Sequence, residues 1–260
     1  MTTTRAPLAG QHALITGAGQ GIGAAIARAL AADGATLTLL GRRREPLDAV
    51  AATLGNACVG VVTGDVTDDM MLAEAFASAR AQRGPIAILV NNAGQAESAP
   101  FHRTTAELWQ RMLAVNLTGS FLCAQLALPD LLQAPAGRII NIASTAGQRG
   151  YAYVTAYSAA KHGVVGLTRS LALELACTNV TVNAVCPGFT ETEMLLQSLE
   201  TIVTQTGRTE AAARAELVKT NPQGRLVQPD DVAAAVRWLC SSGAQSVTGQ
   251  CISVAGGEVM

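Results

Sequence analysis

The sequence predicts one α/β domain, in which a doubly wound parallel sheet is covered by helices on both faces. Seven short apolar, β-rich runs alternate with longer alanine-rich helical patterns. Runs of this kind are expected of parallel strands that are buried on both faces. No repeat, low-complexity segment or linker divides the 260 residues. We therefore expect a single domain that spans 1–260.

The strands are predicted from the short apolar runs, each of which is bounded by turn residues or by a helical pattern. The first run is followed by a glycine-rich turn and by a helix expected over 22–34. In chain order, the expected strands lie at 12–16, 35–40, 57–63, 86–91, 138–143, 180–185 and 249–254.

Two long helices are expected between the later strands. The first runs from about 107 to 131, and Thr104 and Glu107 have the spacing of a capping box at its start. The second runs from about 157 to 177. Near the end of the chain, Pro229 is followed by two aspartates, which is typical of the first turn of a helix.

One segment, 188–226, departs from this alternation. It lies between the sixth strand and the last helix, and it is richer in polar and charged residues. In open α/β sheets, ligands bind beyond the carboxyl ends of the strands. We therefore expect this insertion to cover a ligand.

Composition excludes several classes of function. The formal net charge is −1, so no basic excess would attract nucleic acid or an anionic membrane. The start of the chain lacks the apolar stretch of a signal peptide, and no uninterrupted apolar run approaches the roughly 20 residues of a membrane span. The cysteines have neither zinc spacing nor a disulfide framework, so we expect a cytoplasmic protein without a metal. They are Cys58, Cys123, Cys177, Cys186, Cys240 and Cys251.

The glycine-rich turn "TGAGQGIG" at 16–23 follows the first expected strand and opens the first expected helix. Gly17, Gly21 and Gly23 permit a tight turn and a close approach of the backbone to a pyrophosphate. The helix N-terminus adds free N–H groups and a favourable dipole. In this context the pattern predicts a dinucleotide site of Rossmann type. "NNAG" at 91–94 ends the fourth strand, where its asparagines can satisfy loop backbone groups.

The end of the second strand bears on the choice of cofactor. A dinucleotide-binding fold often has an acid there that holds the adenosine ribose, but this chain has Gly41 followed by Arg42 in "GRRRE". A cation at this place suits a 2′-phosphate and favours NADP(H), while a solvated basic turn is the other interpretation and leaves NAD(H) open. Asp65, after the third strand, is either a turn residue or a partner for the adenine.

Tyr157 and Lys161 are four residues apart on an expected helix, so their side chains can share one face. The chain has sixteen arginines and only two lysines, so a lysine at this position calls for an explanation. An ammonium near a phenol stabilises the ionised form and lowers its pKa from about 10. It is also compact enough to bond ribose hydroxyls at the same time.

Two more polar residues add to this pair. Ser144 lies just past the fifth strand, at the carboxyl edge of the sheet, and Asn116 lies within the long helix, where asparagine is a poor helix former. Taken with "TGAGQGIG", "NNAG", "YSAAK" and "PGF", these residues resemble the short-chain dehydrogenase/reductase family in its compact form. Within that family, the sequence looks most like acyl-thioester and aromatic polyketide ketoreductases.

The resemblance implies a seven-stranded sheet with hydride transfer at its carboxyl edge. Tyr157 would exchange the proton with the substrate oxygen, and Ser144 would position that oxygen. Lys161 would bind the nicotinamide ribose and lower the pKa of Tyr157, and Asn116 would hold a water on the proton path. The residues that would contact the cofactor are Gly17, Gln20, Gly21, Ile22, Gly23, Arg42, Asp65, Val66, Asn92, Ala93, Gly94, Tyr157, Lys161, Pro187, Gly188 and Thr192.

Four other residues near these motifs are not expected to take part in catalysis directly. His162 points away from the catalytic face by helical geometry, so a structural role is expected. Cys186 is expected to pack near the cofactor rather than to act as a nucleophile. Tyr151 and Tyr153 either line a substrate cleft or cap their loop.

These features together predict an NADP(H)-dependent oxidoreductase acting on a ketone or secondary alcohol, most simply a 3-oxoacyl or 3-hydroxyacyl thioester or a similarly bulky ketone. One alternative is an NAD-dependent catabolic alcohol or 3-hydroxyacyl-CoA dehydrogenase. A more remote one is a dinucleotide-sensing protein without catalysis. The resemblance, and the small apolar faces of the two long helices, also predict a homotetramer, with a homodimer as the fallback.

Overall fold

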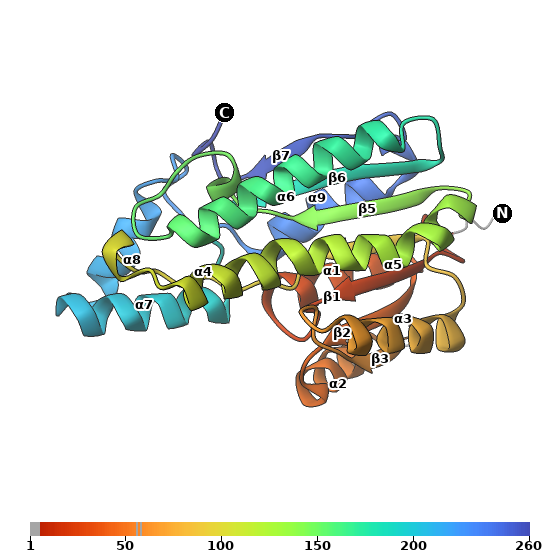
Figure 1. Cartoon of the computed structure of the whole chain (residues 1–260), viewed down its shortest axis with the longest axis horizontal. Coiled ribbons are helices and arrows are strands. Elements are labelled where there is room, and N and C mark those ends of the chain that lie inside the picture. The colour runs from red at the N-terminus through yellow and green to blue at the C-terminus, as the bar shows by residue number, and fades with distance from the viewer. Residues whose placement is uncertain (1–5, 56, 58) are drawn as a thin grey trace.

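All neighbouring strands pair in parallel in the computed structural model, which describes residues 6–55, 57 and 59–260. The described strands form one seven-stranded sheet in the order β3-β2-β1-β4-β5-β6-β7 (Figure 1). This confirms the predicted fold class. The strands are β1 His12–Thr16, β2 Thr36–Gly41, β3 Val59–Thr63, β4 Ile88–Asn91, β5 Gly137–Ile142, β6 Val180–Pro187 and β7 Cys251–Val254.

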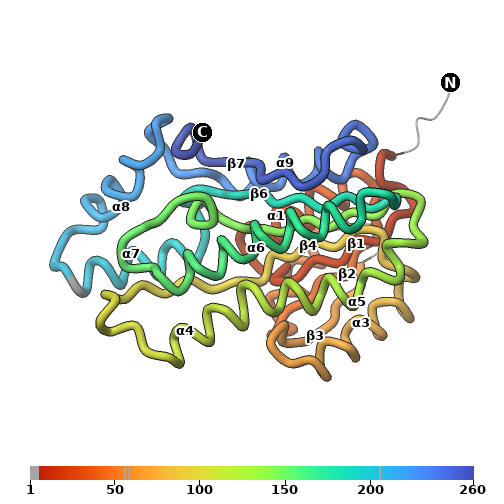
Figure 2. Tube along the Cα trace, turned by 45° about the horizontal axis from the view of Figure 1, so that its top comes forward, coloured from red at the N-terminus to blue at the C-terminus, as the bar shows by residue number. Residues whose placement is uncertain are grey.

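Helices cover both faces of the sheet, because each face of the buried strands carries apolar side chains (Figure 2). On one face lie α1 Gly21–Ala32, α2 Arg44–Thr53 and α9 Pro229–Cys240. On the other lie α3 Asp69–Arg83, α5 Gly119–Gln133 and α6 Thr155–Glu174. Short 3₁₀ turns occur at Phe101–Arg103, Thr145–Gly147 and Ser242–Ala244.

The first long helix differs from the prediction in two ways. It consists of α4, Ala106–Leu113, and α5, which are joined by a wide π-helical turn at Ala114–Thr118. The predicted cap was also wrong by one residue. The Thr105 side chain caps α4 by accepting a hydrogen bond from the Leu108 N–H, while the Thr104 hydroxyl donates to the Pro100 carbonyl instead.

The segment 188–226 contains two helices, α7 Glu193–Thr206 and α8 Glu210–Val218. Leu195, Leu199, Ala213 and Leu226 form a small apolar cluster of their own, separate from the two large clusters against the sheet. Figure 1 shows α4, α7 and α8 together at the left end of the molecule, the end to which the β5 arrow points. The insertion therefore lies at the edge of the sheet where the site residues are expected.

The continuous helical stretch 106–133 is long and apolar enough to cross a membrane by length and composition alone, with a mean hydropathy of 1.4. In the structure, one side of this stretch packs against the sheet, with Cys123, Ala124, Ala127 and Leu131 buried in the apolar cluster there. No group of residues that could hold a metal ion occurs within the described residues. The five cysteines described are free thiols, and Cys58 lies outside the described residues.

Candidate active site

Three elements bring the predicted catalytic side chains together at the carboxyl edge of the sheet. Ser144 follows β5, Tyr157 and Lys161 lie on α6, and Asn116 lies in the π-helical turn. The Lys161 ammonium donates to the carbonyl of Ile142, the last residue of β5, at 2.9 Å. This hydrogen bond, which joins α6 to the end of β5, holds the lysine beside the loop that carries Ser144.

Gly94 marks the centre of this group. A Cβ atom built on Gly94 would lie 2.9 Å from Asn116 Oδ1 and 3.6 Å from Lys161 Nζ. Any larger residue would therefore collide with the asparagine and crowd the lysine. The glycine of "NNAG" allows the β4 loop to pass directly over both groups.

The Ser144 side chain lies close enough to the Tyr157 phenol to stabilise its ionised form. Ser144 also accepts a hydrogen bond from the Ala146 N–H at 3.1 Å, which fixes the start of the turn Thr145–Gly147. Two hydroxyl groups thus converge on one point, as is needed to bind and protonate a carbonyl oxygen.

Burial shifts the pKa values of Tyr157 and Lys161 on α6. Burial raises the pKa of Tyr157 above its ordinary value, although the interaction with Ser144 opposes the shift. It also lowers the pKa of Lys161 to about 8. The direction for Tyr157 is opposite to the one expected from Lys161. The reason is that burial of the phenol is the largest cause of the shift, while Lys161 Nζ bonds to the Ile142 carbonyl and lies 5.6 Å from the centroid of the Tyr157 ring.

Asn116, a poor helix former within the long helix, lies in the π-helical turn. Its side chain is 1% exposed, and its amide donates to the carbonyls of Met112 at 3.0 Å and Gln95 at 2.9 Å. Its carboxamide oxygen accepts from the Gln95 N–H at 3.2 Å. The side chain thus ties the long helix to the loop after β4. Gln95 was missed in the sequence, because a backbone partner leaves no signal in residue type.

The glycine-rich loop is tied to the loop after β4 by side-chain bonds. The Asn92 amide donates to the carbonyls of Thr16 and Gly17, both at 3.0 Å. The Thr16 hydroxyl oxygen accepts from the N–H groups of Asn92 and Ala93 at 3.0 and 2.9 Å. A Cβ atom at Gly23 would lie 2.3 Å from the Gly17 carbonyl oxygen, so only glycine fits there.

The N-terminus of α1 fits an anionic group. No side chain caps it, whereas Asp68, Thr105, Thr192 and Thr209 cap other helices. Gln20, at the cap position, and Ile22, in the first turn, are not fully buried. The backbone N–H groups of such a helix start are suited to a pyrophosphate.

Thr192 and the end of β6 close the site from the other side. A Cβ atom at Gly21, where φ is +51°, would lie 3.1 Å from Thr192 Cγ2. Pro187 is the last residue of β6, and Gly188 follows it. Cys186 is fully buried, and its pKa is raised by a hydrogen bond with Cys251 and by burial, so it packs in the protein as a neutral thiol.

The groups that would contact the adenosine end lie after β2 and β3. Arg42 is exposed, and its guanidinium has no hydrogen-bond or ion-pair partner among the described residues. Asp65 accepts two hydrogen bonds from Thr67, through its N–H at 2.9 Å and its hydroxyl at 2.8 Å, which is the pattern of a turn residue. Val66 is buried against Gly119, the first residue of α5.

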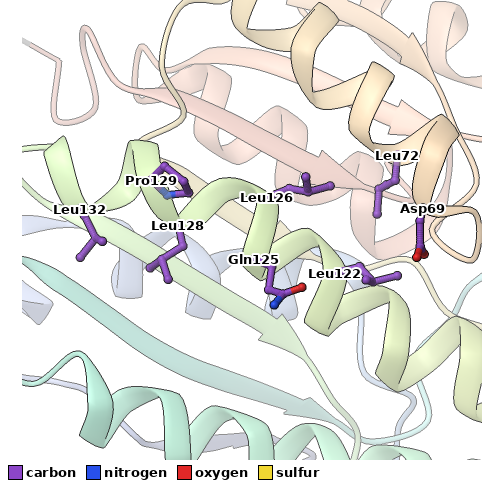
Figure 3. Close-up of a pocket in the computed structure, with 8 residues that line it drawn as sticks. All are labelled: Asp69, Leu72, Leu122, Gln125, Leu126, Leu128, Pro129 and Leu132. Atoms are coloured by element: carbon purple, nitrogen blue, oxygen red, sulfur yellow. The ribbon is translucent and has the colours of Figure 1, made fainter.

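Some features lie outside this group. His162 is exposed, and its ring bonds to the Ser158 carbonyl on its own helix. A groove between α3 and α5, shown in Figure 3, is lined mainly by leucines and contains none of the predicted site residues. Its lining residues are Asp69, Leu72, Leu122, Gln125, Leu126, Leu128, Pro129 and Leu132.

Comparison with known proteins identifies the family of this chain. The family model described as short chain dehydrogenase matches residues 11–202. The chain belongs to the short-chain dehydrogenase family. Like the family, this short-chain dehydrogenase is an oxidoreductase acting on CH–OH groups.

Two relatives and one solved structure resemble this short-chain dehydrogenase along nearly their whole length. A granaticin polyketide synthase putative ketoacyl reductase from Streptomyces violaceoruber is 42% identical, covering 98% of this chain and 96% of that protein. A 3-oxoacyl-[acyl-carrier-protein] reductase from Aquifex aeolicus is 39% identical, covering 96% and 98%. The crystal structure of a variant actinorhodin polyketide ketoreductase with NADPH is 38% identical, with a TM-score of 0.92, covering 95% of this chain and 97% of that one.

Proposed function

We propose that this short-chain dehydrogenase is an NADP(H)-dependent ketoreductase that acts on a 3-oxoacyl thioester or a similarly bulky ketone. The observation that carries the proposal is the convergence of the Ser144 and Tyr157 hydroxyls beside the buried Lys161. The names of the three similar proteins, all ketoreductases or oxoacyl reductases, support the substrate class. A cytoplasmic location, where thiols stay reduced, is part of the proposal.

The hydroxyl pair would bind and protonate the substrate. Ser144 would donate a hydrogen bond to the ketone oxygen and hold it next to Tyr157, which would transfer its proton to that oxygen. Since burial raises the pKa of Tyr157, its phenol is protonated through the neutral range, as reduction requires. Oxidation of an alcohol would need the ionised phenol and should speed up as the pH rises.

The cofactor would be held by the uncapped start of α1, by the loop 92–94 and by the end of β6. When bound, NADPH supplies the hydride. Lys161 would hold the ribose next to the nicotinamide, and Asn116 would hold a water next to Lys161 through which the proton is replaced.

The proposal is tested with a panel of substrates and both cofactors. The panel contains a 3-oxoacyl thioester, a free 3-oxo acid and a bicyclic aromatic ketone, each assayed with NADPH and with NADH. The proposal expects the highest kcat/KM with NADPH and a thioester or bulky ketone. Turnover mainly of the free acid with NADH would favour the NAD-dependent alternative, and no turnover with bound cofactor would favour a dinucleotide sensor.

Arg42 is expected to select NADPH by contacting its 2′-phosphate. A charge-assisted hydrogen bond contributes roughly 1.5–3 kcal/mol, which corresponds to about a 10- to 150-fold change in affinity. Arg42→Ala should therefore weaken NADPH by about that factor and leave NADH nearly unchanged. Arg44→Ala is the matched control, because the Arg44 guanidinium is already paired with Asp48 at 3.2 Å. The measurement is kcat/KM for both cofactors, and equal losses with both would contradict the assignment.

Gly41→Asp should go further and turn the preference towards NADH. The new carboxylate would accept from the ribose hydroxyls and repel a 2′-phosphate. A Cβ atom at Gly41 would meet only the Leu47 side chain, at 3.4 Å, so the substitution fits without strain. The ratio of kcat/KM values for the two cofactors reports the switch. A variant that still prefers NADPH as strongly as the wild type would show that the position does not face the ribose.

Assembly is expected to use the outer faces of α5 and α6, which lie side by side in Figures 1 and 2. Phe121 and Leu132 on α5 and Leu173 on α6 are exposed, Leu173 by 80%. We expect a homotetramer, or a homodimer as the fallback, and Leu173→Glu should yield smaller species. Met70→Glu, at an exposed methionine on α3, is the control that should leave assembly intact. Sedimentation velocity decides, and a wild-type monomer at micromolar concentration would refute the expectation.

A further inference from the structure

Glu258, near the end of the chain, is joined to the catalytic loop by hydrogen bonds. The Tyr151 hydroxyl lies 2.6 Å from Glu258 Oε1 and 2.8 Å from Thr145 Oγ1. A phenol has one proton and an ionised carboxylate can only accept, so Tyr151 donates to Glu258 and accepts from the Thr145 hydroxyl. Thr145 follows Ser144 directly in the chain. The C-terminal segment therefore reaches the residue beside the catalytic serine.

The Tyr151 ring also contacts the opposite loop of the site. It meets the Phe189 ring edge-on, with centroids 6.2 Å apart and planes at 81°. Phe189 follows Gly188, at the end of β6, where the nicotinamide would bind. The Arg149 guanidinium lies 4.9 Å from the Tyr151 ring centroid, and it donates to the Glu258 backbone carbonyl at 3.5 Å. The Tyr151 ring is thus held between two loops that flank the reaction centre, the loop 145–153 and the segment after β6 that carries Phe189.

The Glu258 carboxylate is only partly satisfied by hydrogen bonds in this position. Its second oxygen, Oε2, is buried and has no hydrogen-bond partner among the described residues. It packs against Gly188, where a Cβ atom would lie 2.9 Å away. Burying a carboxylate oxygen without a partner destabilises a folded protein. Among the described residues, the bond from Tyr151 to Oε1 is therefore the one side-chain hydrogen bond that this carboxylate accepts.

We propose that Glu258 is a positioning residue, which acts through Tyr151 to hold the loop 145–153 and so to determine which face of the ketone meets the hydride. The inference rests on the ketone reduction proposed above. A charge-assisted hydrogen bond to the phenol fixes the tilt of its ring more firmly than a neutral one. Without the hydrogen bond from Glu258, the Tyr151 ring becomes more mobile. The substrate then binds less tightly, and the hydride can reach both faces of the ketone. The Ser144 and Tyr157 side chains keep their contacts, and the cofactor loops lose only the packing of Gly188 against Glu258 Oε2.

The test compares Glu258→Ala, Tyr151→Phe and the double variant on a 3-oxobutanoyl thioester of N-acetylcysteamine. Each single variant should raise KM by about 10- to 150-fold, the range that corresponds to one lost hydrogen bond with a charged group. The kcat and the Kd for NADPH should change little, and the enantiomeric ratio of the 3-hydroxy product should fall. Both single variants lose the bond between Tyr151 and Glu258, and Tyr151→Phe also loses the bond from Thr145. The double variant should therefore be no worse than the more affected single variant.

A matched control breaks another contact between the same two segments. The Ser253 hydroxyl, on β7, donates to the Gln148 side chain at 3.0 Å and does not involve Tyr151. Ser253→Ala should keep the enantiomeric ratio. Glu258→Ala should keep or raise the melting temperature, whereas a purely structural role predicts a lower one. An unchanged enantiomeric ratio in Glu258→Ala, an equal loss in Ser253→Ala, or additive losses in the double variant would overturn the proposal.

A second readout does not depend on turnover. Amide hydrogen exchange over 145–153 should be faster in Glu258→Ala and in Tyr151→Phe than in the wild type. If the wild type reduces no ketone, the proposed function fails on that result. If exchange over this loop is unchanged in Glu258→Ala, the positioning role fails, whatever the substrate is.

Discussion

Replacing Tyr157 with phenylalanine should lower kcat by at least the 10²- to 10⁴-fold that general acid–base catalysis typically contributes. The change removes the phenol proton and keeps the ring, which lies 5.6 Å from the Lys161 ammonium. Lys161 keeps its hydrogen bond to the Ile142 carbonyl, so the Kd for NADPH should stay close to that of the wild type. Steady-state kinetics and a fluorescence titration of NADPH measure the two quantities separately.

The matched control for this substitution is Tyr153→Phe. Tyr153 is 65% exposed, and it contacts the loop after β4 through its backbone carbonyl, which accepts from the Ala99 N–H at 2.7 Å. Its phenol is dispensable for that contact, so kcat should be unchanged. If Tyr157→Phe retained more than about a tenth of the wild-type kcat while chemistry limits turnover, Tyr157 would not be the proton donor.

Replacing Lys161 with arginine should abolish most of the activity and weaken the cofactor, although the charge is kept. Lys161 is 5% exposed, and its ammonium fits between the Ile142 carbonyl and Gly94. A guanidinium is larger, planar and fixed in its donor geometry, so it cannot occupy the same space. We expect a loss of kcat/KM of about 10²-fold or more together with a higher Kd for NADPH.

The chain has its own control for this change. Lys219, the only other lysine, is exposed and paired with Glu216 at 2.7 Å. Lys219→Arg should be silent in activity and in cofactor binding. Wild-type kinetics in Lys161→Arg would show that the site needs only a cation, and that the lysine has no special part there.

The fold was predictable because the sequence patterns that indicate its strands, helices and turns are each contained in a short segment. Apolar runs such as 138–143 have the length of buried strands, and the glycine-rich turn at 16–23 has its own residue types. The π-helical turn was not predictable from local sequence, since the side chain of Asn116 within it bonds to the backbone of Gln95, 21 residues earlier. Thr104 and Thr105 are adjacent and have the same side chain, so the sequence does not reveal which of them caps α4; in the structure it is Thr105.

The candidate site was predictable as a set of residue types but not as a charge distribution. Ser144, Tyr157 and Lys161 lie together as the motif implies. The pKa of Tyr157 depends on how deeply α6 packs, which the spacing of two residues does not reveal. The contact between Tyr151 and Glu258 joins residues 107 positions apart, and no motif around either residue predicts it.

The strand order has a consequence for how the chain folds. Among the described strands, β1 and β4 are the one neighbouring pair that is not consecutive in the chain. The glycine-rich loop after β1 and the loop after β4 meet only when this pair forms, through the bond from Asn92 to Thr16 across 76 residues. Long closures are slow, so we expect the cofactor-binding loops to take shape after the β1–β3 half and the β4–β7 half have each begun to form. A bound dinucleotide should then slow unfolding rather than speed folding.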